Sequence, residues 1–180
     1  LKEFGLGMSE FNTNMELSIN LFGQTADEVS KLNTGLVEFA KEIKMMPSVV
    51  SRNFQLVAQS IMYDGQKVQE QFANFQEMSA KTGVSVNKLM GTFGQQTDTI
   101  SGASSFAAGL NTILGRNAFS ATQILMMSES ERMEATRAAL KDSQIYRDYM
   151  SGDEKLKKFA LRAIAGRLQM GTDETRRFLD

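Results

Sequence analysis

The sequence contains no cysteine and no histidine among its 180 residues, and both absences restrict what the protein can do. Without cysteine there are no disulfides and no thiolate zinc sites. Without histidine the chain lacks the commonest metal ligand and the usual general base near neutral pH. Acidic pairs such as Asp153 and Glu154 coincide with expected helix starts, where capping explains them. We therefore expect no metal, no cofactor and no enzymatic activity.

Long apolar runs and an excess of charge of one sign are also missing. No stretch of about eighteen apolar residues could span a bilayer and no signal segment opens the chain, so a soluble protein is expected. Twenty Lys and Arg stand against twenty-one Asp and Glu, a formal net charge of -1. Because there is no basic excess, we expect no specific nucleic-acid partner. The start at Leu1 rather than at Met leads us to expect one portion of a larger protein.

Proline occurs only once, at Pro47, and this favours helices. Residues of high helix propensity are abundant, while runs of alternating β-branched residues are missing. We predict an all-α protein in which elongated helices with coiled-coil character are followed by a bundle of short helices. The length is enough for one ordinary domain or for two helical subdomains.

The most regular pattern in the sequence is a heptad repeat between residues 28 and 46. Its apolar side chains recur at alternating steps of three and four residues, the spacing of a helix that buries one narrow stripe. The six residues of this stripe, called the seam below, are Val29, Leu32, Leu36, Phe39, Ile43 and Met46. We expect the seam to be buried between helices as the oligomer or helix interface, with polar residues such as Asn33 outside. A looser version of the pattern continues back to Met8 and forward to Met78.

The ends of the seam helix are marked by local motifs. Thr25 and Glu28 form a T-x-x-E capping box that starts the helix. The helix is expected to run to about Met46, because Pro47 lacks the backbone donor that a continuing helix needs. Pro47 also suits the first turn of a following helix, which we expect over residues 48–63.

Residues beside the seam indicate what it binds. Gly35 and Ala40 are small and leave room for a third helix, and no complementary charge pattern selects a different partner. We therefore expect a homo-oligomer, with a trimer favoured. In the alternative, the seam closes within one chain, as a hairpin of the helices on either side of Pro47.

Changes in composition divide the chain into three predicted segments. Residues 1–80 form the elongated, heptad-like segment, and residues 81–119 form a low-charge helical segment rich in small residues. Residues 120–180 form a bundle of short helices. Small residues let helices approach closely, and such a contact is expected around Gly109. Transient membrane contact by residues 92–127 is a further alternative.

Cap motifs predict where the later helices begin. Ser85 is an expected N-cap after Gly83, at a corner that is similar to the turn of a helix-turn-helix DNA reader but that we interpret as the corner of a helical hairpin. Boxes of the form S-x-x-E or S-x-x-Q predict further N-caps at Ser120, Ser128 and Ser151. The expected helices lie near residues 121–127, 129–146 and 153–169, and Thr172 is expected to cap a last helix.

Four short runs of residues in the last two segments follow one another in a characteristic order. They are F-A-A-G-L-N-T-I-L-G from Phe106 to Gly115, S-A-T-Q-I-L-M-M-S-E-S-E-R from Ser120 to Arg132, A-T-R-A-A-L up to Leu140, and K-F-A-L-R-A-I-A-G-R-L up to Leu168. In this order, the chain from Ser79 to Asp180 resembles the helical region of tape-measure and related internal tail proteins of tailed bacteriophages.

The resemblance implies a structural virion protein. Tape-measure proteins are long helical chains in the tail lumen or tip, often trimeric, which help to set tail length and are released during genome delivery. Tube, hub or tip proteins of the tail would be its partners. A helix of 180 residues would span only about 270 Å, so the chain would be one portion of such a protein. The alternative is a cytoplasmic helical adaptor or regulatory module whose seam binds a partner helix.

Overall fold

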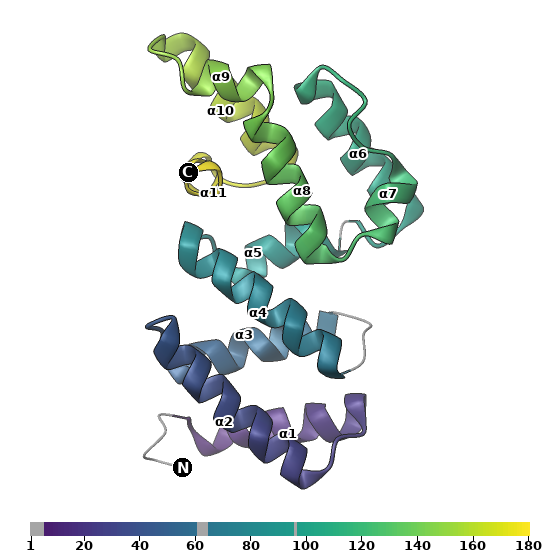
Figure 1. The fold of residues 1–180 in the computed structure, drawn as a ribbon, viewed down its shortest axis with the longest axis vertical. Helices are drawn as coiled ribbons and strands as arrows, with labels where there is room; N and C mark the ends of the chain where they lie inside the picture. Colours follow the sequence, from purple (N-terminus) through teal and green to yellow (C-terminus); the bar gives the residue numbers. More distant parts are fainter. Residues whose placement is uncertain (1–5, 61–64, 96) are drawn as a thin grey trace. The chain divides into compact units, whose positions relative to one another are not determined.

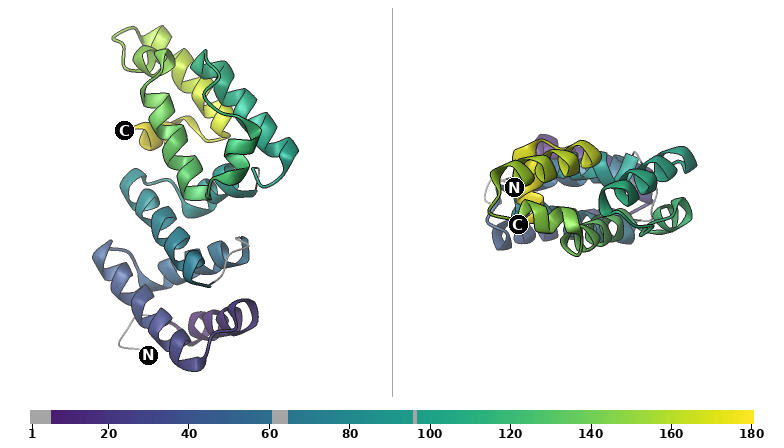
Figure 2. Two further views of the ribbon diagram at one scale, coloured as in Figure 1. Left: turned by 45° about the vertical axis from the view of Figure 1, so that its right-hand side comes forward. Right: turned by 90° about the horizontal axis from the view of Figure 1, so that it is seen from above.

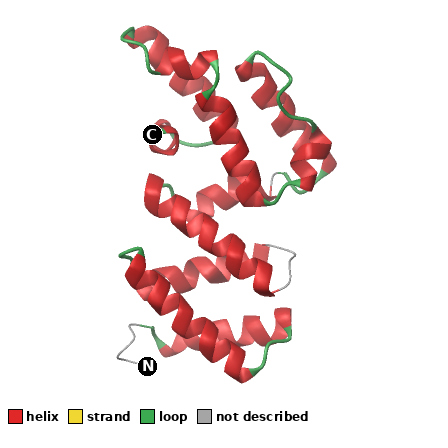
Figure 3. Cartoon of the chain, in the orientation of Figure 1, coloured by secondary structure: helices red, strands yellow, loops and turns green. Residues whose placement is uncertain are grey.

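The computed structural model describes residues 6–60, 65–95 and 97–180, and every regular element in these ranges is a helix (Figure 1 and Figure 3). The all-α class is therefore confirmed. In chain order the α-helices and the π-helix η2 are α1 (Met8–Phe22), α2 (Ala26–Glu42), α3 (Pro47–Ser60), α4 (Gly65–Thr82), α5 (Val86–Met90), η2 (Gly91–Gln95), α6 (Ile100–Leu114), α7 (Ala121–Met126), α8 (Glu129–Lys141), α9 (Gln144–Tyr149), α10 (Glu154–Leu168) and α11 (Thr172–Leu179).

Contacts divide the chain into two units, Leu1–Ala80 and Lys81–Asp180. The first unit holds α1, α2, α3 and most of α4, and the second holds the helices from α5 to α11. Each unit buries its own set of apolar side chains, including Phe54 and Val57 in the first and Phe93 and Leu110 in the second.

In the first unit, α1, α2 and α3 pack against one another (Figure 2), and polar side chains of the three helices meet between them. Asn14 of α1 is fully buried, and its amide nitrogen donates to Asn33 Oδ1 of α2 at 2.7 Å and to Ser51 Oγ of α3 at 2.9 Å. Gln55 Nε2 donates to Asn14 Oδ1 at 2.9 Å, and Asn33 Nδ2 donates to Val29 O at 3.1 Å. Both N–H groups and the oxygen of the Asn14 amide are thus paired.

Apolar residues surround these polar side chains. Five of the buried ones, from α2 and α3, are Val29, Val37, Ala40, Val50 and Val57. Burying a side chain of this size contributes about 1.5–3 kcal/mol, but an unpaired buried amide costs about 1–3 kcal/mol. The polar network therefore selects the alignment of the three helices, because a shifted alignment would leave its members unpaired.

The connection between α2 and α3 differs from the sequence prediction. α2 ends at Glu42, earlier than the expected end near Met46. Lys44 adopts a left-handed φ of 57°, and Met45 N–H donates to Ala40 O at 2.9 Å, which closes the last turn. Pro47 is the first residue of α3, where its missing N–H removes no helical hydrogen bond. α2 and α3 pack against each other, as in the hairpin alternative.

α3 is described as far as Ser60, so the expected helix end at residue 63 lies outside the described residues. α4 begins at Gly65, immediately after that gap.

In the second unit, aromatic residues from three elements meet in the core. Phe93 of η2 is fully buried and stacks on Phe178 of α11, with ring centroids 5.6 Å apart. Phe106 of α6 meets Phe93 edge to face at 6.0 Å. Thr92 Oγ1 donates to Leu168 O at 3.0 Å and so links η2 to the end of α10. The π-helix, which no sequence pattern predicted, thus places Phe93 in the core.

Small residues bring α6 close to α10, as expected. Ala103, Ala107 and Gly109 are buried, whereas Ala108 is exposed. A Cβ atom added to Gly109 would lie 3.3 Å from Arg167 Cδ of α10, a tight distance. Gly109 therefore allows the two helices to approach.

Asn111 fixes the loop that follows α6. Its Oδ1 accepts hydrogen bonds from the N–H groups of Ala118 at 2.8 Å and Phe119 at 2.9 Å, and its Nδ2 donates to Phe119 O at 2.8 Å. The loop turns through Gly115, whose φ of 67° favours glycine. The chain then runs back, so that α7 lies beside α6 (Figure 1 and Figure 2).

Most of the predicted N-caps are confirmed. Each confirmed cap accepts a hydrogen bond at its side-chain oxygen from the N–H group three residues further on. These caps are Thr25, Ser85, Ser120 and Ser128. Thr25, Ser120 and Ser128 also form the complete capping box.

The prediction of Ser151 as an N-cap is wrong, because Asp153 takes that position. Asp153 Oδ1 accepts from Lys155 N–H at 2.7 Å and from Leu156 N–H at 3.2 Å. A carboxylate at a helix start gains from the helix dipole as well as from these bonds, so it is preferred over the nearby hydroxyl. Ser151 Oγ instead accepts from Asp153 N–H at 3.3 Å.

Two further helix boundaries differ from the prediction. The helix expected over residues 129–146 is two helices, because α8 ends at Lys141 and Ser143 caps α9. Thr172 is not a cap but the first residue of α11, and Gly171 takes the N-cap position.

We expect Asn14→Ala to lower the free energy of unfolding of the first unit by about 2–4 kcal/mol, because it removes the donor to the buried Asn33 Oδ1 and Ser51 Oγ and one acceptor of the half-buried Gln55. Asn12→Ala, an exposed change on the same helix, should alter it by less than about 0.5 kcal/mol. Hydrogen exchange of the α1–α3 amides in the full chain measures both. Equal protection in the two variants would contradict the proposed role of the network.

For the caps, Ser128→Ala and Asp153→Ala should each destabilise the chain by about 0.5–2 kcal/mol, since each leaves helix N–H groups without an acceptor. Ser151→Ala should cost less than Asp153→Ala. Urea denaturation of the full chain followed by circular dichroism gives the comparison. A larger loss for Ser151→Ala than for Asp153→Ala would restore Ser151 as the cap.

Candidate functional site

The seam residues lie in three different environments. Val29, Leu32 and Leu36 are buried within the single chain, and Phe39 and Ile43 are partly exposed. Met46 is 68% exposed, so the expected burial is wrong for Met46 within one chain. The reason is that α2 ends at Glu42, before the chain reaches Met46.

The buried face of α2 is rotated away from the centre of the seam. Asn33 is buried and joins the polar network, although the heptad pattern placed it outside. Val37 and Ala40 are buried on the same side of α2. Since α1 and α3 cover this side, the seam residues Leu32 and Phe39 lie toward the edge of the packed face.

A groove of about 540 Å³ opens at this edge, between α2 and α4. Its apolar lining consists of Leu32, Leu36, Phe39, Phe54, Phe72 and Ala73. Phe72 of α4 meets Phe54 edge to face at 5.5 Å and Phe39 at 6.0 Å, so α4 contacts α2 and α3 through aromatic side chains. Three seam residues thus border an open apolar surface.

Gly35 keeps the groove open on the α2 side. It lines the groove, and a Cβ atom added to it would meet no atom within 4 Å. The sequence singled out Gly35 as leaving room for another helix, and it lies beside this space. Phe54 and Phe72 belong to the looser continuation of the heptad pattern, which is the signal that points to them.

Polar residues surround the mouth of the groove. Two of them, Gln24 and Gln69, belong to no pattern that the sequence analysis identified. Glu28 and Lys31 supply one charge of each sign. Glu28 Oε2 accepts from the N–H and the hydroxyl of Thr25, both at 2.8 Å, and these hydrogen bonds, the backbone one first, lower the pKa of Glu28. Because its lining is apolar and its mouth carries Glu28 and Lys31, the groove can hold an apolar side chain next to charged groups.

A second cluster of charged residues is buried in the other unit. Arg132 is only 4% exposed, and its Nη1 donates to Phe93 O and Asp98 Oδ1, both at 3.0 Å. Its Nε donates to Ile124 O at 2.7 Å. Arg132 therefore ties α8 to η2 and α7 by pairing main-chain carbonyls, which is a structural role.

Glu129 lies in the same cluster. Its Oε2 has no hydrogen-bond partner among the described residues. Burial raises the pKa of Glu129, and the nearby charge of Arg132 opposes this effect. A raised carboxyl pKa is common in catalytic acids, but the neighbouring bonds of Arg132 serve the fold, so this cluster is a weaker candidate site than the groove.

The described residues form neither a membrane-spanning helix nor a metal-binding group. In the described ranges, no helix combines the length and the apolar character needed to cross a bilayer. The described side chains also include no group of three or more acidic residues placed to hold a metal ion.

Comparison with known proteins gave no match: no family model matches the chain, and neither curated proteins nor solved structures matched it significantly.

Because burial raises the pKa of Glu129, the folded chain binds a proton there more readily than the unfolded chain, and stability falls as the pH rises above the ordinary value of 4.5. Glu129→Gln should therefore stabilise the chain at about pH 7 and have little effect near pH 3.5, where the carboxyl is protonated in both states. Urea denaturation of both chains at each pH tests this. A less stable Gln variant at neutral pH would mean that attraction to Arg132 outweighs burial.

Proposed function

We propose that this chain is a structural, non-catalytic protein that assembles through its helices, as one portion of a tape-measure or related internal tail protein of a tailed bacteriophage. Its place would be the lumen or tip of the tail, where it helps to set tail length and is released during genome delivery. The resemblance of residues 79–180 supports the phage assignment, and the all-helical fold is consistent with it.

The observation that carries the assembly part of the proposal is the open groove beside the seam. Apolar side chains of Leu32, Leu36 and Phe39 border it without filling it. Apolar grooves of this kind commonly receive one face of an amphipathic helix. In the proposed homo-oligomer, for which a trimer is favoured, a helix of another copy covers this surface. Tube, hub or tip proteins would be further partners.

The second candidate function is a cellular helical adaptor or regulatory module. The same groove favours it, because the groove suits a helix of a different protein as well as one of this chain. The two candidates differ in location and in partner, so they are separated by where the chain is found.

The test uses tail particles purified from the phage or lysogenic strain that encodes the chain. We expect antibodies against the 180-residue chain to detect it in these particles, and deletion of its coding sequence to give absent tails or tails of altered length. A plasmid copy should restore normal tails. Normal tails after deletion, or a chain found only with cytoplasmic partners, would contradict the phage assignment and favour the adaptor.

A further inference from the structure

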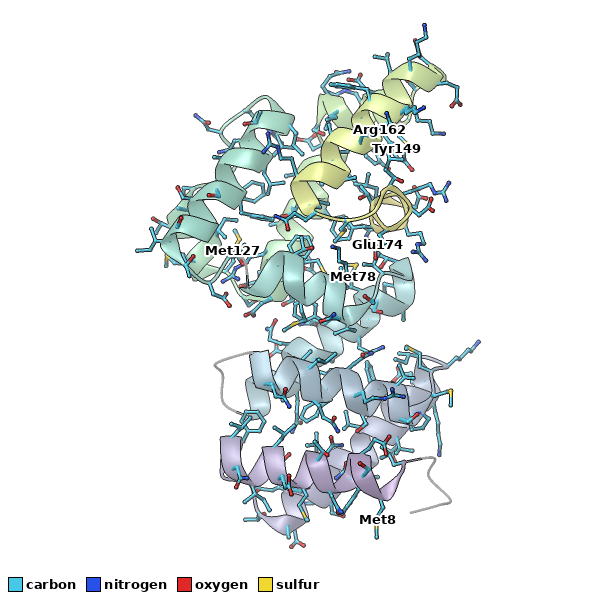
Figure 4. The ribbon with its side chains drawn as sticks, turned by 180° about the vertical axis from the view of Figure 1, so that it is seen from behind. Met8, Met78, Met127, Tyr149, Arg162 and Glu174 are labelled. Carbon is cyan, nitrogen blue, oxygen red and sulfur yellow. The ribbon has the colours of Figure 1, made fainter. Side chains whose placement is uncertain are left out.

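α10 exposes a face that is both apolar and positively charged. Phe159 is 67% exposed and lies among Lys155, Lys158 and Arg162, the last of which is labelled on α10 in Figure 4. Leu156, one turn before Phe159, is 44% exposed. The opposite side of the helix is buried through Ala160, Ile164 and Leu168.

This face has no charge partner in the part of the chain that the structure describes. No acidic side chain there pairs with Lys155, Lys158 or Arg162. A large exposed aromatic side chain is typical of a protein-binding surface, because aromatic anchors carry much of the binding energy of interfaces. We therefore expect the binding partner of this face to have an apolar pocket within an acidic surface.

The groove of the first unit supplies the apolar pocket, its lining carries one charge of each sign, and the acidic excess belongs to the unit as a whole. It offers the aromatic lining described above, and the unit that contains it has six Lys and Arg against ten Asp and Glu. The second unit, which contains α10, has fourteen Lys and Arg against eleven Asp and Glu. Opposite charges on the two units favour contact between unlike units of two copies.

The exposed face fits within the length of the groove. The groove lining follows α2 from Glu28 to Phe39, and the exposed face follows α10 from Lys155 to Ala163. These stretches advance eleven and eight residues, about 17 Å and about 12 Å of helix. The volume of about 540 Å³ leaves room for Phe159 and a neighbouring side chain.

We propose that α10 of one copy docks in the groove of a second copy, with Phe159 inserted between α2 and α4 and with Lys155 and Arg162 near Glu28 at the mouth. This inference rests on the self-assembly proposed above and names the two surfaces that carry it. Because the surfaces differ, each copy uses both, and the contact repeats head to tail. Such a contact closes into a ring, for example of three copies, or continues as a filament.

Another helix with exposed apolar side chains, α1, fits the groove less well. α1 exposes Met8 by 63% and Ile19 by 43%. It belongs to the same acidic unit as the groove and carries Glu10 and Glu16, so docking it would bring two acidic surfaces together.

The test is light scattering on the full chain at increasing concentration. Phe159→Ser should raise the dissociation constant of self-association at least about tenfold, as expected for an aromatic anchor. Met126→Ser is the matched control, because Met126 is 81% exposed on α7 and should leave association unchanged. Gly35→Arg should also weaken association, since it fills the groove from a position with no neighbour within 4 Å.

A gain in affinity gives a stricter test. Lys31→Glu makes the groove mouth more acidic and should tighten association about threefold at low salt, with the gain lost at high salt. If Phe159→Ser associates like the wild type while Ile19→Ser does not, α1 is the occupant and this inference fails, but self-assembly stands. A wild-type chain that stays monomeric at every concentration contradicts both. Monomers that bind anionic vesicles through Phe159 would assign the α10 face to a lipid surface.

Discussion

The structure of the first unit depends on one buried amide. Asn14 can pair both of its N–H groups and its oxygen only when α1, α2 and α3 meet in one alignment, with Asn33, Ser51 and Gln55 in reach. Apolar burial supplies more of the stabilisation, but it tolerates small shifts and rotations of helices, whereas an unpaired buried amide does not. The polar network therefore decides which face of α2 is buried.

That choice of face has a consequence for assembly. By burying Asn33 and Val37, α2 leaves Leu32 and Phe39 at the edge of its packed face, where Phe72 of α4 meets Phe39. Some residues of the heptad pattern are therefore buried within the chain, and some border the open groove. In our account, α10 of another copy covers the groove, so the same helix contributes to folding and to self-association.

The sequence allowed correct predictions where the interacting residues are close together in the chain. The capping box of Thr25 with Glu28 joins residues three apart, so it is legible in the sequence, and the scarcity of proline and of β-branched runs indicated helices. The Asn14 network and the carbonyl contacts of Arg132 join residues far apart in sequence, and no periodicity reveals them. Likewise, the seam predicted three of the residues that line the groove. It did not predict the polar residues at the mouth of the groove or the exposed face of α10.

Cross-linking of a mixed sample detects the head-to-tail contact between copies without any substitution in the chain. Equal amounts of ¹⁴N-labelled and ¹⁵N-labelled full chain are mixed, treated with an amine-reactive cross-linker and analysed by mass spectrometry. The account predicts mixed-isotope links between Lys31 at the groove mouth and Lys155 or Lys158 on α10. If no link joins Lys31 to either of these lysines, or if such links join only chains of the same isotope, the head-to-tail contact is contradicted.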